Sequence, residues 1–461
     1  MSSFEGLMVS VSGIRGRVGA GLTPEVVATY AAGFGAWATG RTPGRPIVVG
    51  RDSRVSGPMF HRVVLSALES VGCQVIDIGV VPTPTVQLAV EHHHAAGGLA
   101  ITASHNPVEW NALKFIGPSG LFLDQADSLS FRAATDAGFA RATWDRLGAT
   151  TLDTGAVQRH LDLILALDYL DVPALRARKL KVALDCVRGA GYPIMSALLH
   201  ALGCEVTAIH TEADGRFPHA PEPIAENLGD LSALVRQSGA DIGLAVDPDV
   251  DRLAIVDELG SPIGEDYTLA FATALVLRKR PGVVVTNLST SRVVEDAAIA
   301  AGQRCVLSPV GEANVAACMK AERAAIGGEG NGGVILPDLH LGRDAPAGAA
   351  LVLQLLCSSG MTPSQLKAAS PRYEIVKDKL DRPDAPLGEV YAALRAAFPD
   401  ATVDVQDGLR LSWPDRWVHV RPSGTEPIVR VIAEAPTRAE AEALVSQSRE
   451  PLDELVRAPA R

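Results

Sequence analysis

The segment GGLAITASHNP, residues Gly97–Pro107, is the point from which this 461-residue chain is best understood. Its apolar first half has the length of a short buried strand, and Pro107 disfavours helical backbone at the residue before it. Ser104 is therefore expected on a loop just past the carboxyl end of a strand, where open α/β sheets bind their ligands. A hydroxyl beside His105, with Lys114 a little further on, suits covalent transfer chemistry. The same residue types populate plain turns, so the loop alone leaves both interpretations open.

The composition sets limits on size and class. A chain this long exceeds one hydrophobic core, and three or four domains of about 100–200 residues are expected. A net charge of −11 argues against non-specific binding to nucleic acid or to an anionic membrane, but allows a local basic pocket. The sequence shows no signal-peptide pattern and no apolar run of the ~18 residues that a span requires. We therefore expect a cytoplasmic protein.

Neither the cysteines nor the histidines indicate a transition-metal site. The six cysteines are scattered without a Cys-x-x-Cys pair, which favours buried thiols in a reducing compartment over zinc ligands. His92–His94 ends an expected helix over 85–91, where histidines suit the helix dipole better than a metal. His219, in the proline-rich loop 218–223, is a weaker metal candidate still.

Three parts of the chain share one pattern. A strand, a helix and a glycine-led second strand recur from about residues 47, 181 and 282. Such wide spacing indicates repeated domains and not a solenoid. Strands that alternate with helices predict parallel or mixed sheets covered on both faces. A further short strand is expected over 9–12, and Thr23 is expected to cap a helix.

The last part of the chain follows a different pattern. A strand over 373–379 and a helix over 387–398 precede several short strands, and Thr437 caps a last helix. The short strands are expected over 402–405, 408–412, 417–420 and 428–433. This order predicts an α+β domain on a mainly antiparallel sheet.

Three aspartates, Asp247, Asp249 and Asp251, stand two positions apart. In an extended loop this spacing directs all three carboxylates to one side, and oxygen-only ligands suit Mg²⁺ or Ca²⁺. An EF-hand is excluded, although Glu258 has the twelfth-position carboxylate, because Arg252 stands where the loop needs glycine. The flanking segments also have strand character. A metal-binding hairpin loop is therefore predicted, with a solvated acidic turn as the alternative.

Two further loops have binding character. In IGGEGNGGV, residues 326–334, Glu329 and Asn331 alternate in a way that suits hydrogen bonds to sugar hydroxyls, and no Gly-Lys-Ser/Thr follows to make a P-loop. The segment RPSGTEP, residues 421–427, combines arginine, two hydroxyls and free N–H groups into an anion-binding nest. Its candidate ligands are Arg421, Ser423, Gly424 and Thr425, with Arg430 as a second guanidinium. A plain turn is the alternative for each loop.

Together the motifs supply a hydroxyl nucleophile, a cation site, a hydroxyl-binding loop and a phosphate-binding loop. The fold class expected is α/β, with three similar α/β domains on mixed sheets and a C-terminal α+β domain around a central cleft. The chemistry expected is phosphoryl transfer on a polyhydroxylated phosphate ester. Each domain is expected to contain one loop: the serine loop in residues 1–155, the aspartate loop in 156–258, the sugar-binding loop in 259–372 and the phosphate-binding loop in 373–461.

This set of loops resembles the α-D-phosphohexomutase superfamily along the whole chain. The resemblance implies that Ser104 is phosphorylated and that this phosphate joins the three aspartates around Mg²⁺. It also implies a sugar phosphate as substrate, a sugar bisphosphate as activator, and a monomer or homodimer. The same resemblance implies a role for each candidate residue. The transferring phosphoryl group is steadied by Arg15 and Arg252, and proton transfer near it is served by Lys114 and His105. The sugar hydroxyls are bound by Glu329 and Asn331, and the non-reacting phosphate is held by Arg421, Ser423, Gly424, Thr425 and Arg430.

Details of the loops bear on the substrate. Pro248 and Val250 replace the usual glycines of the metal loop, and Gly-Glu-Gly-Asn-Gly-Gly replaces the common Gly-Glu-x-Ser-Gly-His. This variant, with the segments 110–114 and 217–222, resembles the phosphoglucosamine mutases, which implies conversion of glucosamine 6-phosphate to glucosamine 1-phosphate. A phosphomannomutase/phosphoglucomutase is the alternative. A non-catalytic sugar-phosphate binder and a metal-dependent phosphatase are the rivals from other classes.

Overall fold

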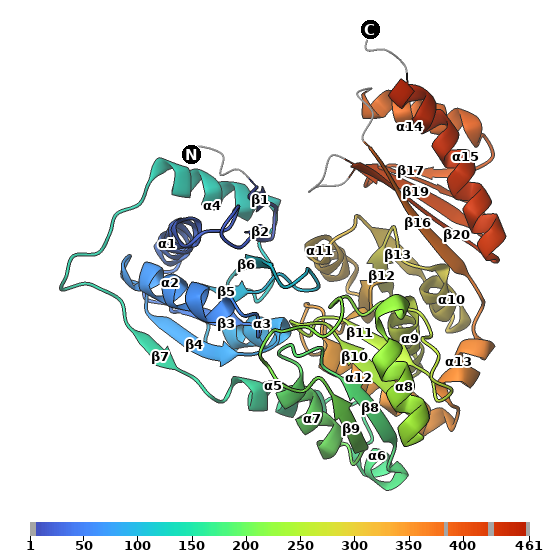
Figure 1. Cartoon of the computed structure of the whole chain (residues 1–461), viewed down its shortest axis with the longest axis horizontal. Coiled ribbons are helices and arrows are strands. Elements are labelled where there is room, and N and C mark those ends of the chain that lie inside the picture. Colours follow the sequence, from blue (N-terminus) through green and yellow to red (C-terminus); the bar gives the residue numbers. More distant parts are fainter. Residues whose placement is uncertain (1–5, 382–385, 423–427, 458–461) are drawn as a thin grey trace.

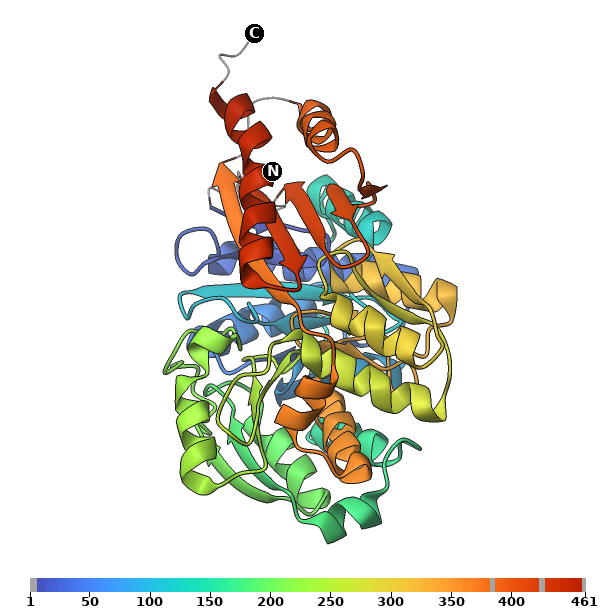
Figure 2. The same ribbon diagram turned by 90° about the vertical axis from the view of Figure 1, so that its right-hand side faces the viewer.

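The computed structural model describes residues 6–381, 386–422 and 428–457, which form four units, each built on its own sheet (Figure 1). Three units are α/β and the last is an antiparallel sheet with two helices, as the sequence predicts. In Figure 1 the units follow one another along an arc, with the first and the last at its ends. The view in Figure 2 places the last sheet above the other three units.

The first unit has a seven-stranded sheet in the order β1-β2-β6-β5-β3-β4-β7. Thr23 caps α1 through the Val26 N–H, as predicted. The strand predicted over 9–12 is wrong, because Ser10 turns back to the Gly13 carbonyl and the longer strand begins there. The elements are β1 (Met8–Val9), β2 (Gly13–Arg17), α1 (Pro24–Arg41), β3 (Ile47–Arg51), α2 (Gly57–Glu69), β4 (Val75–Val80), α3 (Thr83–His92), β5 (Gly97–Ile101), β6 (Trp110–Ile116), α4 (Gln125–Ala137) and β7 (Thr150–Leu152).

The second and third units each have a four-stranded sheet, in the orders β11-β10-β8-β9 and β13-β12-β14-β15. The second unit comprises α5 (Ala156–Leu165), α6 (Val172–Arg178), β8 (Lys181–Asp185), α7 (Tyr192–Ala201), β9 (Glu205–Ile209), η1 (Ala225–Asn227), α8 (Gly229–Ser238), β10 (Ile242–Val246) and β11 (Leu253–Val256). The third comprises α9 (Asp266–Lys279), β12 (Val284–Asn287), α10 (Arg292–Ala300), β13 (Cys305–Ser308), α11 (Glu312–Glu322), β14 (Ile326–Glu329), β15 (Gly333–Ile335), α12 (Ala345–Ser359) and α13 (Pro363–Ala369).

The repeat is longer than the sequence pattern suggests. In all three units the two predicted strands are parallel neighbours. A third strand, also parallel, pairs with the free edge of the first strand, and a fourth strand pairs antiparallel with the third. The serine, aspartate and sugar loops are the turns β5–β6, β10–β11 and β14–β15, which join the third strand to the fourth. The three loops are therefore topologically equivalent, one in each repeat.

The C-terminal unit is a five-stranded antiparallel sheet in the order β16-β20-β19-β18-β17. Its helices α14 and α15 pack against this sheet, and its apolar core is separate from the others. The elements are β16 (Glu374–Asp381), α14 (Leu387–Ala397), β17 (Thr402–Asp404), β18 (Leu409–Ser412), β19 (Trp417–Pro422), β20 (Ile428–Ala435) and α15 (Arg438–Arg457), and the N–H of Glu440 confirms the Thr437 cap.

The second and third units share one hydrophobic core, to which the buried α9 and α12 both contribute. No single described helix is long and apolar enough to cross a membrane. The helices α12 and α13 reach that length and composition only when taken together, and they meet at an angle of 83°. The shared core makes units two and three a single block against which unit one packs.

A buried carboxylate joins this block to the first unit. Asp344 caps α12 through the Ala347 N–H and accepts hydrogen bonds from the Nε2 atoms of His160 (2.7 Å) and His340 (2.9 Å). Thr85, on α3 of the first unit, contacts His160 Nδ1 at 2.8 Å. Every ring nitrogen of the two histidines thus has a partner, since the Gly342 N–H donates to His340 Nδ1.

Replacing Asp344 by alanine is expected to lower the free energy of unfolding by about 3 kcal/mol, through loss of the cap and of acceptors for two buried histidines. The matched control is Asp124→Ala, which removes an exposed N-cap from α4 and should cost about 1 kcal/mol. Thermal unfolding of both variants tests the difference. If both variants lost the same amount of stability, the hydrogen bonds from the buried histidines to Asp344 would not contribute to the stability of the fold.

Candidate active site

Ser104 lies at the β5–β6 turn with a left-handed backbone, φ 49°. Its side chain is buried, and its Oγ donates to Asp247 Oδ2 at 2.8 Å. His105 Nδ1 lies 3.3 Å from the same Oγ. A non-glycine residue in this conformation costs on the order of 1 kcal/mol or more, and such strain is common at active sites. The strained turn aims the hydroxyl of the first unit at the aspartate loop of the second.

Arg54, which is fully buried, holds this turn in place. Its guanidinium donates to the carbonyls of Ser104 (2.6 Å) and Asn106 (2.6 Å), and to those of Pro107 and Trp110. Asp52 balances the charge of Arg54 at 3.1 Å. Neither residue was identified from the sequence as part of the site. Their position directly after β3, beside β5 in the sheet, is the signal that could have indicated it.

The aspartate loop is a tight turn, so the extended segment predicted from the spacing of the aspartates is wrong. Val250 has φ 63°, and its N–H returns to the Asp247 carbonyl. The turn still brings Asp247, Asp249 and Asp251 together, and their ligand atoms lie within 4.8 Å of one another. The predicted hairpin is confirmed, because β10 and β11 pair antiparallel on either side.

The three carboxylates fit a cation. Among the described residues, Asp249 Oδ1 and Asp251 Oδ1 are buried oxygens with no hydrogen-bond partner. Burial and the neighbouring Asp251 and Asp249 raise the pKa of Asp247 well above its usual value. Three buried carboxylates with free oxygens are the donor set that a hard divalent cation binds.

Lys114 lies at the edge of this group, on β6. Its Nζ is 2.7 Å from Asp249 Oδ2 and 3.7 Å from Asp251 Oδ2. Burial alone would lower the pKa of Lys114, but the two carboxylates raise it above its ordinary value. Lys114 is therefore a buried ammonium between the serine loop and the aspartates.

The other predicted cations surround His105. Arg15 donates to Asn106 Oδ1 at 2.6 Å, and Arg252 donates to Glu222 at 3.2 Å. Burial, together with Arg252 and Arg15, lowers the pKa of His105 well below its usual value, so the ring is neutral at pH 7. Glu222, which also lies 3.9 Å from His105, was not predicted as a site residue.

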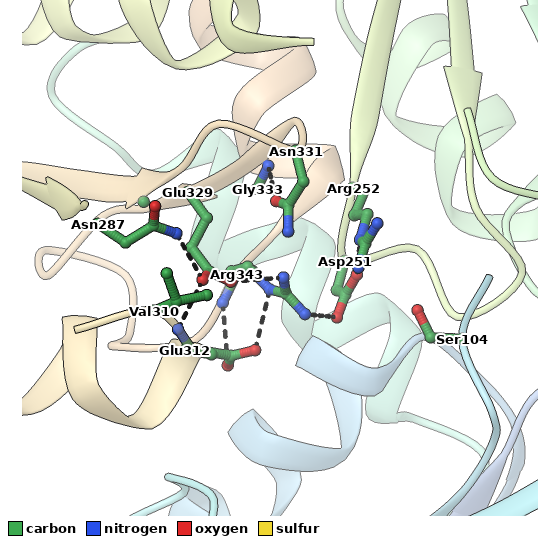
Figure 3. Close-up of polar contacts among 12 residues, drawn as sticks. Ser104, Asp251, Arg252, Asn287, Val310, Glu312, Glu329, Asn331, Gly333 and Arg343 are labelled. Carbon is green, nitrogen blue, oxygen red and sulfur yellow. Dashed lines mark hydrogen bonds and ion pairs between the residues drawn. The ribbon is translucent and has the colours of Figure 1, made fainter. Parts of the chain in front are cut away.

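In the sugar loop, Glu329 is buried at the end of β14. Its Oε1 accepts from Asn287 (2.8 Å) and from the Gly311 N–H (3.0 Å). Asn331 lies beyond it, and its Oδ1 accepts the N–H of Gly333 at 3.2 Å. This leaves the Asn331 amide nitrogen directed toward the space between the loops (Figure 3).

Arg343 links the sugar loop to the aspartate loop. Its three nitrogens donate to three carboxylates: Nε to Glu312 (3.0 Å), Nη1 to Glu329 (2.7 Å) and Nη2 to Asp251 (2.6 Å) (Figure 3). The guanidinium is buried, and although burial disfavours its charge, the carboxylates raise the pKa of Arg343 well above its ordinary value. Arg343 is not predicted as a site residue from the sequence, because no motif surrounds it.

The phosphate loop is only partly described. Arg421 lies at the end of β19, with its Nε 3.3 Å from Asp407, and Arg430 stands opposite it on the neighbouring strand β20. The remaining predicted ligands, Ser423, Gly424 and Thr425, lie outside the described residues. The structure thus brings together the predicted groups of three loops, and places Arg421 and Arg430 beside each other on the fourth unit.

Comparison with known proteins agrees with this layout. Four family descriptions match in succession: phosphoglucomutase/phosphomannomutase alpha/beta/alpha domain I over residues 7–139, domain II over 158–260, domain III over 264–373, and the C-terminal domain over 376–450. The chain therefore belongs to the phosphoglucomutase/phosphomannomutase family, within the α-D-phosphohexomutase superfamily.

Similar proteins carry two kinds of name. A probable phosphoglucosamine mutase of Methanopyrus kandleri is 37% identical over 95% of this chain and 96% of its own length. A phosphoglucomutase/phosphomannomutase of Thermococcus kodakarensis is 36% identical over the same shares, 95% and 96%. A crystal structure of a family protein from Burkholderia thailandensis superposes with a TM-score of 0.84, at 27% identity over 98% of both chains.

Proposed function

We propose that this protein is a phosphohexomutase that converts glucosamine 6-phosphate to glucosamine 1-phosphate through a phosphoserine at Ser104. The observation that carries the proposal is the Ser104 hydroxyl, held 2.8 Å from a buried group of three carboxylates with free oxygens. A binding protein would not need a strained serine against a cation site. We propose that the enzyme works in the cytoplasm.

In the proposed reaction, the phosphoryl group leaves Ser104 Oγ for a sugar hydroxyl, and a second phosphate of the resulting bisphosphate later returns to Oγ. In the first transfer the sugar hydroxyl loses one proton and Oγ gains one, and the second transfer reverses this. Neutral His105, whose Nδ1 lies 3.3 Å from Oγ, is placed to take the Oγ proton when the serine is phosphorylated and, once protonated, to return it when the phosphoryl group leaves. Mg²⁺ held by the three aspartates would neutralise charge on the moving group. Arg252 supports the same role, because its buried Nε makes no hydrogen bond among the described residues and lies 3.9 Å from Asp251 Oδ1, beside the proposed cation site.

The sugar is expected to meet Glu329 and Asn331, and its far phosphate to meet the loop at 421–427. The neutral amide of Asn331 and the absence of a histidine in this loop favour the amino sugar in this proposal. The names of the relatives divide between glucosamine and glucose or mannose phosphates. Substrate preference is therefore the property to measure.

Turnover of glucosamine 6-phosphate is expected to exceed that of glucose 1-phosphate and mannose 1-phosphate by more than about tenfold in kcat/KM, or ~1.4 kcal/mol. The assay contains Mg²⁺ and the matching sugar bisphosphate. Faster turnover of glucose or mannose phosphate would contradict the proposed preference for glucosamine phosphate but would still support a mutase. Release of inorganic phosphate without an isomerised sugar would favour a phosphatase and overturn the proposal.

Removal of the divalent cation is expected to stop turnover, and Mg²⁺ to restore it. Mg²⁺ at about a hundred times its Kd should also stabilise the folded protein by ~2.7 kcal/mol. Asp249→Asn should lose this stabilisation, whereas Asp136→Asn, a substitution at an exposed position of α4, should keep it. If Mg²⁺ stabilised both variants equally, the cation would bind at a site other than the three aspartates.

A further inference from the structure

A second cluster of metal-ligating side chains lies in the second unit, outside the proposed active site. Asp185 ends β8 and His210 follows β9, and these strands are parallel neighbours in register. His219 joins them from the loop between β9 and η1. The ligand atoms of all three lie within 4.8 Å of one another. His219 is the weaker metal candidate on the sequence alone, because its proline-rich loop could approach the cleft but nothing in the sequence shows that it does.

The hydrogen bonds of His219 leave one ring nitrogen facing an anion. His219 Nδ1 lies 2.9 Å from the Ala220 carbonyl, which can only accept, so Nδ1 carries the hydrogen. Nε2 then faces Asp185 Oδ2 at 3.1 Å. In the neutral ring this nitrogen is a lone pair, and a lone pair against a carboxylate needs a positive group between them. Either a proton or a metal ion satisfies this arrangement.

His210 has the same two-sided environment. Its Nδ1 lies 3.0 Å from Asp185 Oδ1, and its Nε2 is 3.7 Å from the carboxylate of Asp230. Each histidine therefore directs one nitrogen at Asp185 and has an acceptor behind the other, the Ala220 carbonyl or Asp230. Metal-bound histidines have this outer acceptor almost without exception, since it fixes the tautomer and the ring orientation.

We propose that Asp185, His210 and His219 form a binding site for a transition-metal ion of the Zn²⁺ type, separate from the three-aspartate site. Two imidazole nitrogens and one carboxylate suit Zn²⁺, Co²⁺ or Ni²⁺ and not Mg²⁺, which prefers oxygen. Asp185 is buried, whereas the two histidine side chains are each about a fifth exposed, 20% and 19%, so an ion reaches the site from solvent. Solvent water completes the ligand set.

The loop that this site would fix reaches the active site. Beyond His210, Gly215 packs against the backbone of Ser53 and Arg54, and the Phe217 ring lies 5.1 Å from the Arg54 guanidinium. Glu222, at the end of the same loop, contacts Arg252 at 3.2 Å. A metal ion at the base of the loop therefore holds the segment that supports the serine turn and Arg252.

The test is calorimetric titration of the tag-free protein with Zn²⁺, in excess Mg²⁺ and at about pH 8, where protons compete less with the metal for its ligand atoms. One Zn²⁺ per chain is expected to bind. His210→Ala and His219→Ala should each weaken it by at least about a hundredfold, and Asp230→Asn by about tenfold. His200→Ala, at an exposed position of α7, is the matched control and should bind as the unaltered protein does.

Two further measurements test whether the Zn²⁺ site is separate from the three-aspartate site. Asp249→Asn should retain the Zn²⁺ site, and Co²⁺ at the site should give a visible absorption band that His219→Ala abolishes. The proposal is overturned if no Zn²⁺ binds, if binding survives in both histidine variants, or if it disappears in Asp249→Asn. Circular dichroism of the metal-free variants separates loss of a ligand from loss of the fold.

Discussion

Replacement of Ser104 by alanine is expected to reduce mutase turnover by at least about 10⁴-fold, because it removes the only atom on which the proposed phosphoryl-enzyme forms. His105 keeps its neutral ring in the variant, but its Nδ1 contact at 3.3 Å is to Oγ itself, so the ring loses the hydroxyl on which it is proposed to act.

The fold should tolerate this change. Arg54 holds the turn through backbone carbonyls, which alanine retains, and the Thr102 hydroxyl still accepts the N–H of residue 104 at 2.9 Å. The variant loses one hydrogen bond to Asp247, worth about 1 kcal/mol net, because the raised pKa of Asp247 disfavours its charged form. Turnover is thus expected to collapse while thermal unfolding changes little.

Turnover and intact-protein mass spectrometry check this result together. The unaltered protein incubated with sugar bisphosphate should gain one phosphoryl group, which peptide analysis places on Ser104. Ser66→Ala, an exposed position on α2, should match the unaltered protein in both measurements. Turnover by Ser104→Ala within tenfold of that control would remove the phosphoserine from the mechanism.

The repeated architecture could be predicted because it depends on local patterns. The three parallel strand pairs, the Thr23 cap and the hairpin around the aspartates follow from periodicity, caps and turn residues, all of which act over a few positions. The sequence pattern stopped at two strands per repeat, however. The third strand and the antiparallel fourth lie far along the chain, so the equivalence of the three loops appears only when the sheets are formed.

The supporting residues could not be predicted for a related reason. Arg54, Glu222 and Arg343 act through partners 50, 30 and 92 positions away, and no local pattern shows which carbonyl or carboxylate a buried guanidinium will meet. The error in the aspartate loop has a different cause. A β-branched residue such as Val250 disfavours left-handed backbone, and tertiary contacts impose it.

Replacement of Arg343 by methionine is expected to lower the free energy of unfolding by about 3–5 kcal/mol and kcat/KM by at least ~10²-fold. Methionine fills much of the same volume but leaves Asp251, Glu312 and Glu329 without their shared cation. Arg343→Lys should recover only part of the loss, because an ammonium lacks the planar fork that reaches three carboxylates in three directions. Arg41→Met, which breaks the exposed pair with Asp127, is the matched control and should cost less than ~1 kcal/mol.

The pH dependence separates lost charge pairing from lost packing. Burial alone would raise the pKa of Glu329, but Arg343 and Asn287 hold it below its usual value, so the stability that this pairing supplies is present above the unfolded pKa of about 4.3 and is lost as pH falls. Without Arg343 the buried carboxylates take up protons at higher pH. The destabilisation by Arg343→Met should therefore be largest at pH 7 and shrink toward pH 5, as chemical unfolding at each pH would measure. A destabilisation that stays constant over this range would mean that Arg343 acts by filling space, and the link between the aspartate and sugar loops would then not be electrostatic.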